Sequence, residues 1–253
     1  MDVRDVLPTL EVLRAIHQEF GELMVIGSYA RDDVCVFQAG CSPSRATQDV
    51  DMALAVVDME TYVKRTEHLE RDRAGIGSRV IRRDAPQAQV DVTPAIADES
   101  VVELNEGVLT DITGMHEAYR SATPEDVEGV IFRVKTLLAM ILLKMVAWNM
   151  RREHRDALDL LELFEAASAW RIDHDAVYVS AQFEQYADFE QACAHIVGQT
   201  CAAELPVASR TARTILERDG HVLLAEVLRN TPSDRCEMIR ERWEAFSQGL
   251  KEA

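Results

Sequence analysis

The sequence predicts an α+β protein in which a mixed β-sheet with flanking helices is followed by an all-helical C-terminal domain. Three observations favour this class. Short apolar runs and period-two alternation, both typical of strands, are concentrated in the first half of the chain. Amphipathic helical spacing dominates after about residue 120. The 253 residues are 47% hydrophobic with few glycines and prolines, which indicates globular domains with real cores. We therefore expect two domains, at residues 1–120 and 121–253.

The first domain is predicted to combine short strands with two helices. Strands are expected at Leu23–Ile26, Asp49–Val57, Arg79–Arg82, Gln89–Thr93, Val101–Leu104 and Val108–Ile112, and helices at Val6–Phe20 and Met59–Arg71. The stretch Asp32–Ser44 contains glycine, proline and two cysteines, and it indicates an inserted hairpin or loop.

The second domain is predicted to begin with a helix at Thr123 and Pro124, because threonine caps a helix and proline suits its first turn. Apolar residues then recur with helical spacing: Ile131, Val134, Leu138, Ile141, Met145 and Trp148. Lys144 interrupts this apolar stripe. The helical pattern continues to the end of the chain, with breaks near Arg171–Asp175, Leu205-Pro206 and Thr231-Pro232.

An acidic pair, Asp49 and Asp51, stands at the beginning of the second predicted strand. The alternation of Val50, Met52, Leu54 and Val56 with the other positions predicts one buried face. Both aspartates then lie on the opposite face, close together. Carboxylate oxygens suit Mg²⁺ or Mn²⁺, which nucleotide enzymes hold through one or two carboxylates and the phosphates of the substrate. The alternative is a pair of solvated charges at the edge of a strand.

A possible phosphate-binding turn precedes this pair. Leu23–Ile26 leads directly into Gly27 and Ser28, where a helix is expected to start. Glycine lets the backbone approach a ligand closely, and free amides at such a turn can cradle phosphate oxygens. The hydroxyl of Ser28 adds one more donor. A Gly-Ser pair after an apolar run is also compatible with an ordinary turn.

Taken together, these residues resemble the nucleotidyltransferase superfamily of DNA polymerase β type. Gly27-Ser28-Tyr29-Ala30-Arg31 is similar to the opening motif of the minimal nucleotidyltransferases. Arg45-Ala46-Thr47-Gln48-Asp49-Val50-Asp51 is closer to AbiEii-like toxin nucleotidyltransferases, which carry an arginine and a Ser or Thr just before the acidic pair. The resemblance covers about the first hundred residues and implies a nucleotidyltransferase-type sheet. Gly27, Ser28, Arg45 and Thr47 would then bind substrate. The interval from Ser28 to Asp49 is longer than in minimal members.

The resemblance also implies a third acidic residue on a later strand, and Asp91 fits that position between Val90 and Val92. Asp49, Asp51 and Asp91 would then be the catalytic and metal-binding residues, with Mg²⁺ or Mn²⁺ as cofactor. The alternative for Asp91 is a turn residue shortly before Pro94.

AbiEii-like enzymes also have a helical lysine, then an arginine and an Asp-x-x-Asp segment. Lys144 and the run from Arg152 through Asp156 to Asp159 are similar to this pattern. By resemblance, Lys144 would reach the phosphates of the nucleotide, while Arg152 and Asp156 would line the floor of a cleft that the helical domain completes. The alternatives are a lysine whose ammonium lies in water and an ordinary surface ion pair between Arg152 and Asp156.

Composition restricts the possible partners. The net charge of −17 disfavours broad nucleic-acid binding, because phosphate contacts need lysine and arginine. The N-terminus carries acids and lacks an apolar core, so we expect no signal peptide. The richest apolar stretch, Leu137 to Trp148, is too short and too charged to span a membrane. Five cysteines without a C-x-x-C motif indicate reduced thiols and a cytoplasmic protein.

The sequence therefore predicts a transferase of phosphorus-containing groups that moves an NMP from an NTP to a hydroxyl acceptor. The resemblance implies an AbiEii-like toxin acting on a tRNA end, with an antitoxin protein as a further partner. A second interpretation is a small-molecule transferase of the aminoglycoside type, for which an acidic surface suits cationic acceptors. A third is a non-catalytic nucleotide-binding regulatory module.

Overall fold

The computed structural model describes residues 14, 17, 18, 20, 21, 23–32, 39–41, 49–67, 70, 71, 79–81, 89–105, 108–127, 130–169, 173–186, 188–229 and 231–252. The chain divides into two compact units. Unit 1 comprises Met1–Ala30 and Arg45–Thr136, and unit 2 comprises Arg31–Ser44 and Leu137–Ala253. The predicted helix Val6–Phe20 and the predicted insert Asp32–Ser44 lie largely outside the described residues. The predicted α+β class is confirmed.

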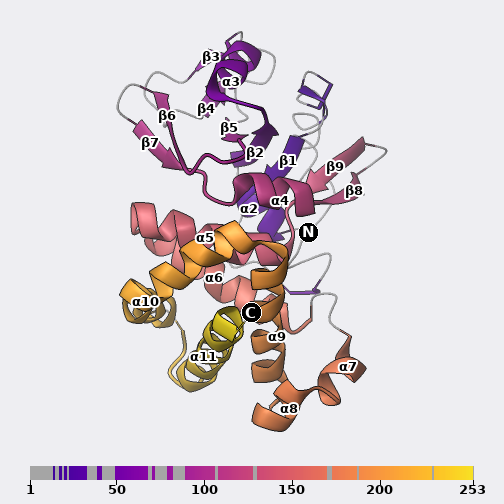
Figure 1. Cartoon of the computed structure of the whole chain (residues 1–253), viewed down its shortest axis with the longest axis vertical. Helices are drawn as coiled ribbons and strands as arrows, with labels where there is room; N and C mark the ends of the chain where they lie inside the picture. Colours follow the sequence, from indigo (N-terminus) through magenta and orange to yellow (C-terminus); the bar gives the residue numbers. More distant parts are fainter. Residues whose placement is uncertain are drawn as a thin grey trace. The chain divides into compact units, whose positions relative to one another are not determined.

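Unit 1 is built on a mixed β-sheet (Figure 1). Over the described part of the chain, its seven strands lie in the spatial order β3 (Glu70–Arg71), β4 (Arg79–Ile81), β5 (Gln89–Ala95), β2 (Asp49–Ala55), β1 (Leu23–Ile26), β9 (Val130–Val134) and β8 (Thr123–Val127). Strand β2 runs parallel to β5 and antiparallel to β1, while β1 runs parallel to β9. A separate hairpin is formed by β6 (Val101–Asn105) and β7 (Val108–Asp111).

The predicted strands form where the apolar patterns indicated. All four side chains of β1 are buried, as expected for a central strand, and Met52 and Leu54 of β2 are inaccessible to solvent. Helix α3 (Met59–Thr66) follows β2 and begins at Asp58, whose carboxylate accepts a hydrogen bond from the amide of Thr61 at 2.7 Å. Two short helices complete unit 1: α2 (Gly27–Asp32), whose last two residues belong to unit 2, and α4 (Met115–Ser121).

The expected helix start at Thr123 is wrong. Residues Thr123–Val127 form β8, which pairs with β9 as an antiparallel hairpin, and β9 joins the sheet beside β1. Phe132 and Val134 are buried at period two. The spacing of Ile131, Val134 and Leu138 fits a helix equally well, so periodicity alone did not separate the two structures. The sheet unit therefore extends to Thr136, and the boundary lies there instead of near residue 120.

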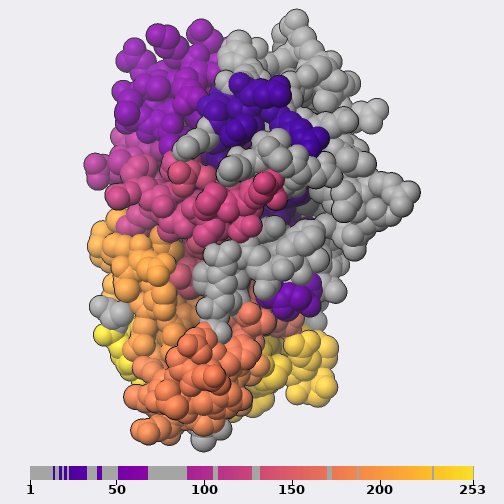
Figure 2. All heavy atoms as spheres, turned by 90° about the vertical axis from the view of Figure 1, so that its right-hand side faces the viewer, coloured from indigo at the N-terminus to yellow at the C-terminus, as the bar shows by residue number. Residues whose placement is uncertain are grey.

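From Leu137 onward, unit 2 is helical. Its helices are α5 (Leu137–Arg151), α6 (His154–Ala167), α7 (His174–Tyr178), α8 (Ala181–Tyr186), α9 (Phe189–Glu204), α10 (Pro206–Leu228) and α11 (Cys236–Glu252). The three predicted breaks are confirmed between α6 and α7, α9 and α10, and α10 and α11. Pro206 occupies the first turn of α10, where its missing N–H costs nothing. Figure 2 shows the face of unit 2 that carries the short helices α7 and α8, drawn in orange.

The core of unit 2 combines the apolar helix α5 with a very close crossing of α9 and α11. An added Cβ at Gly198 of α9 would lie 2.3 Å from the carbonyl oxygen of Phe246. An added Cβ at Gly249 of α11 would lie 2.0 Å from the carbonyl oxygen of His195. Only glycine allows the two backbones to approach this closely. None of the helices that the structure describes has the length and apolar character needed to cross a bilayer.

Candidate functional site

The strand register of unit 1 brings two of the three predicted carboxylates together. Asp51 of β2 and Asp91 of β5 are direct register partners on adjacent parallel strands. Adjacent strands lie about 4.8 Å apart, and partners in register share one face of the sheet. Both residues are half-buried. Residues that are 40 positions apart in the chain therefore form a neighbouring pair of carboxylates, as the sequence predicted.

Gly27 lies directly against the first of these carboxylates. Asp51 is also the register partner of Ile26, the last residue of β1, so Gly27 follows at the point where β1 passes into α2. A Cβ built on Gly27 would stand 1.9 Å from Oδ2 of Asp51. Gly27 also has a φ of +66°, which glycine adopts without strain. Any side chain at this position would displace the carboxylate of Asp51.

The remaining residues predicted for the sheet site are described only in part. The backbone of Asp49 pairs with Gln89 at the start of β2, but its side chain lies outside the described structure. Arg45 and Thr47 also lie outside the described residues. Ser28 follows Gly27 in α2 and is 8% exposed. The structure therefore brings together Gly27, Asp51 and Asp91, with Ser28 next to Gly27 in the chain, while the roles predicted for Ser28, Asp49, Arg45 and Thr47 stay predictions.

The donor set of this site fits a hard divalent cation. Two neighbouring carboxylates supply the oxygen ligands that Mg²⁺ and Mn²⁺ prefer, with further positions filled by water or phosphate. Within the described residues, no group of three His, Cys, Asp or Glu side chains is arranged to hold a metal ion. The side chain of Asp49, the other member of the predicted acidic pair, lies outside the described structure, so its predicted role as a metal ligand stays a prediction.

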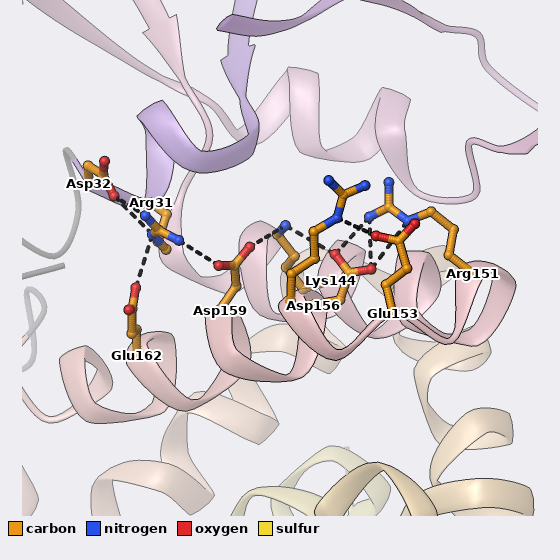
Figure 3. A network of polar contacts seen from close by, with 9 residues as sticks. Arg31, Asp32, Lys144, Arg151, Glu153, Asp156, Asp159 and Glu162 are labelled. Carbon is orange, nitrogen blue, oxygen red and sulfur yellow. Dashed lines mark hydrogen bonds and ion pairs between the residues drawn. The ribbon is translucent and has the colours of Figure 1, made fainter. Parts of the chain in front are cut away.

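A second set of charged residues forms a network within unit 2 (Figure 3). Arg31, the last residue but one of α2, is completely buried and contacts three carboxylates. Its Nη1 donates to Asp159 Oδ1 at 2.5 Å, its Nη2 donates to Asp32 Oδ1 at 2.6 Å, and its Nε lies 3.0 Å from Glu162 Oε2. A buried guanidinium needs such partners, because it cannot lose its charge.

The same contacts determine the pKa values in this part of unit 2. Burial alone would lower the pKa of Arg31, but the charges of Asp159, Asp32 and Glu162 outweigh it, so the pKa of Arg31 is raised. For Asp32, burial is the largest effect and raises the pKa of its carboxyl group, although the hydrogen bond from Arg31 acts in the opposite direction. Arg31 therefore stays positively charged in the folded chain.

Lys144 connects this buried arginine to the helix hairpin formed by α5 and α6. Its ammonium lies 2.5 Å from Asp159 Oδ2 and 3.2 Å from Asp156 Oδ1, and both carboxylates are fully buried. Arg151, at the end of α5, completes the chain of contacts: its Nη2 donates to both oxygens of Asp156, at 2.7 and 2.9 Å. Lys144 is thus held by two carboxylates, so the alternative of a lysine whose ammonium lies in water is wrong, and its predicted phosphate contact stays a prediction.

The alternative of a surface ion pair between Arg152 and Asp156 is wrong, because Arg152 pairs with Asp219. Arg152 follows the last residue of α5 and has a φ of +56°, which lies in the left-handed region and does not continue the helix. Its Nη2 donates to Asp219 Oδ2 at 2.5 Å, and its guanidinium carbon lies 4.3 Å from the ring centre of Trp148. The hydrogen bond from Arg152 is the main cause that lowers the pKa of the Asp219 carboxyl group. The i, i+4 spacing that places two residues on one face of a helix does not apply to Arg152 and Asp156, because α5 ends before Arg152 and Asp156 lies in α6.

Sequence reasoning missed Arg31 and Arg151 as members of this network. Arg31 was visible only as the last residue of the Gly27–Arg31 motif, and its partner Asp159 lies 128 positions further along the chain. Arg151 was visible as a neighbour of Arg152, but the local pattern did not show where α5 ends.

Comparison of the chain with protein-family models and with curated proteins gives no match. The candidate site therefore stands on two geometric facts: the register pairing of Asp51 with Asp91, and the close contact between Gly27 and Asp51.

Proposed function

We propose that this protein is a metal-dependent nucleotidyltransferase that moves an NMP from an NTP to a hydroxyl acceptor. The observation that carries the proposal is the convergence of Asp51, Asp91 and Gly27 at one point of the sheet. A carboxylate pair beside a residue without a side chain provides ligands for a cation and leaves room for a phosphate group.

The residues divide the work as follows. Asp51 and Asp91, together with Asp49 two residues before Asp51, would hold Mg²⁺ or Mn²⁺ through their carboxylate oxygens. When bound, the metal would neutralise charge on the triphosphate and on the attacking hydroxyl. Asp91 accepts the proton of the acceptor hydroxyl, the acceptor oxygen attacks the α-phosphorus, and the bond from the α-phosphorus to the bridging oxygen breaks, so that pyrophosphate leaves. Ser28 donates a hydrogen bond to a phosphate oxygen. Gly27 keeps the carboxylate of Asp51 in position, because it leaves that space free.

The network of unit 2 has a different role in this proposal. Lys144 already contacts Asp156 and Asp159, and Arg31 contacts Asp159, Asp32 and Glu162. These contacts support a function in stabilising unit 2. The phosphate contact that the resemblance implies for Lys144 stays a prediction, as does the position of Asp156 on the floor of a cleft.

The acceptor is proposed to be an RNA end, such as that of tRNA, in line with the resemblance to AbiEii-like toxins and their antitoxin partners. One observation favours a second acceptor class. The net charge of −17 attracts cationic molecules and repels polyanions, which suits a small hydroxyl compound of the aminoglycoside type.

The decisive experiment measures the transfer of label from radioactive NTPs, in the presence of Mg²⁺, to total RNA and separately to aminoglycosides. We expect Asp51→Asn to lower the rate by at least about a thousandfold, since it removes a charged ligand and leaves the shape unchanged. Asp98→Asn is the matched control, because Asp98 is exposed in the same unit and asparagine tolerates its φ of +65°.

Each outcome has a defined meaning. Wild-type rates in the Asp51→Asn variant would refute the proposed site. Thermal stabilisation by nucleotide and Mg²⁺ without transfer to any acceptor would instead favour the non-catalytic nucleotide-binding module. Labelling of RNA or of an aminoglycoside would decide between the two acceptor classes.

A further inference from the structure

Unit 2 contains a groove of about 590 Å³ between α10 and α11. The residues on its floor are apolar: Leu216, Gly220 and Leu224 come from α10, and Trp243 comes from α11. Its rim is polar and includes the carboxylates of Glu244 and Glu252. A volume of this size, with an apolar floor and a few polar groups around it, is typical of small-molecule sites.

Gly220 indicates that the sequence keeps this space open. It lies in the interior of the 23-residue helix α10, where glycine weakens a helix relative to alanine. Helix packing does not explain it. An added Cβ at Gly220 would meet only the side chain of Leu216, at an ordinary 3.7 Å, whereas at Gly198 and Gly249 it would collide with backbone atoms. Gly220 thus lowers the stability of α10, and no close contact with a neighbouring backbone requires a glycine there. It does line the groove.

One of the rim carboxylates is held in place by a set of polar contacts. Glu252 Oε1 accepts a hydrogen bond from Gln248 Nε2 at 2.7 Å, and Oε2 lies 3.1 Å from Nε2 of the buried His195. The other ring nitrogen of His195, Nδ1, lies 2.9 Å from the hydroxyl of Tyr186, and that hydroxyl also donates to Gln248 Oε1 at 3.2 Å. These contacts come from α8, α9 and α11. The hydrogen bond that Glu252 accepts comes from Gln248, and its carboxylate stays about half exposed at the rim of the groove.

The charges of the groove select the chemical class of its ligand. Glu244 and Glu252 lie eight residues apart on α11, which corresponds to a rise of about 12 Å on one side of the helix. Lys251 is the one lysine among the residues that line the groove, and no arginine lines it, so carboxylates outnumber fixed cations. The net charge of −17 adds a potential that also attracts cations.

We infer that this groove is a binding site for an aliphatic amine, with the ammonium group at Glu244 or Glu252 and the hydrocarbon part over Leu216, Leu224 and Trp243. The site lies entirely within unit 2 and is separate from the proposed transferase residues of unit 1. Its existence therefore does not depend on the proposed function.

The test titrates the full-length protein with octylamine, octanoate and octanol by calorimetry at low salt. These probes share one chain length and differ in the charge of the head group. We expect saturable one-to-one binding of octylamine and much weaker binding of the other two. Equal or tighter binding of octanoate would overturn the assignment of a cationic ligand, and no saturable binding of octylamine would overturn the site.

Two substitutions place the ligand in the groove. Gly220→Leu fills the floor and should weaken octylamine binding by at least about tenfold. It should also raise the melting temperature, because leucine favours the helix. Glu244→Gln removes a rim charge and should weaken binding about threefold, as expected for a solvent-exposed ion pair. Octylamine binding that is unchanged in Gly220→Leu, whether the melting temperature rises or falls, would contradict the inference.

Matched controls lie on the same helix outside the groove. Thr214→Ala raises helix propensity in α10 at an exposed position, and Glu217→Gln removes an exposed carboxylate next to the groove. Both variants should bind octylamine as the wild type does. Weakening by Glu217→Gln equal to that by Glu244→Gln would mean that octylamine responds only to the overall acidity of the chain.

Discussion

Aspartates gather in both units of this protein, but each unit gives them different neighbours. In unit 2, the fully buried Asp156 and Asp159 contact lysine and arginine side chains at hydrogen-bond distance. In unit 1, Asp51 and Asp91 are placed beside each other by the register of two parallel strands, and the backbone of Gly27 lies against Asp51.

This difference helps to distinguish acidic residues that stabilise the fold from acidic residues that are candidates for catalysis. A carboxylate that is matched by a cation of its own chain has found the partner that burial requires, and it holds elements together. Two carboxylates side by side repel each other, and a divalent cation from outside relieves that repulsion. The network of unit 2 therefore has a structural role, while the chemistry proposed for the pair in unit 1 rests on the strand register and on the contact with Gly27.

The largest expected effect on stability is that of Asp159→Asn. This change removes one carboxylate shared by Arg31 and Lys144, and it leaves a fully buried guanidinium with fewer partners. Breaking a buried ion pair typically costs about 3–5 kcal/mol, so the free energy of unfolding should fall by this amount. Urea denaturation followed by circular dichroism measures it.

Glu217→Gln is the control for this change, because it removes an exposed carboxylate from the same unit. It should leave the denaturation midpoint unchanged. A loss below about 1 kcal/mol for Asp159→Asn, the range of an exposed ion pair, would show that the network contributes little to stability and would remove the contrast between the units.

Gly27→Ala tests the carboxylate pair of unit 1 through the close contact between Gly27 and Asp51. The new methyl group would stand within 1.9 Å of Asp51 Oδ2 and force the carboxylate to move. We expect the proposed transfer to slow by about a hundredfold, since a misplacement of about 1 Å in a reacting group has an effect of this size. The labelled-nucleotide assay measures the rate, and circular dichroism checks the fold.

Gly21→Ala separates the clash from backbone strain. Gly21 has a φ of +72°, close to that of Gly27, but an added Cβ there would meet nothing within 4 Å. Both variants pay about 1–2 kcal/mol for a left-handed alanine. Only Gly27→Ala should lose transfer activity. Equal losses in the two variants would mean that strain, and not the position of Asp51, explains the effect.

The sequence predicted the strands that carry the candidate site of unit 1, because short-range patterns determine them. The apolar run at Leu23–Ile26, the alternation in Asp49–Ala55 and the valines around Asp91 each indicated a strand, and all three lie adjacent in the sheet. The hairpin β8–β9 was missed because its apolar residues also fit helical spacing. What placed it in the sheet is pairing with β1, which lies more than a hundred residues earlier.

The network of unit 2 was predictable only in part for a similar reason. The sequence singled out Lys144, Asp156 and Asp159 as charged residues on neighbouring helical segments, but it did not pair the lysine with either aspartate. The contact between Arg31 and Asp159 depends on tertiary structure, because no local pattern connects residues so far apart. Which of the two arginines contacts Asp156 depends on where α5 ends. Arg152 marks that point with a left-handed backbone conformation. Sequence rules assign this conformation to glycine or asparagine and not to arginine.

The smallest effect should distinguish these two adjacent arginines. Arg151→Ala removes two hydrogen bonds to the buried Asp156, and a lost hydrogen bond to a charged group costs about 1.5–3 kcal/mol. We place the expected loss near the lower limit, because Lys144 still contacts Asp156 and Arg151 itself is 41% exposed. Arg152→Ala removes an exposed pair with Asp219 and should hardly change the urea midpoint. A larger loss of stability for Arg152→Ala than for Arg151→Ala would favour the alternative that the sequence left open, an ion pair between Arg152 and Asp156.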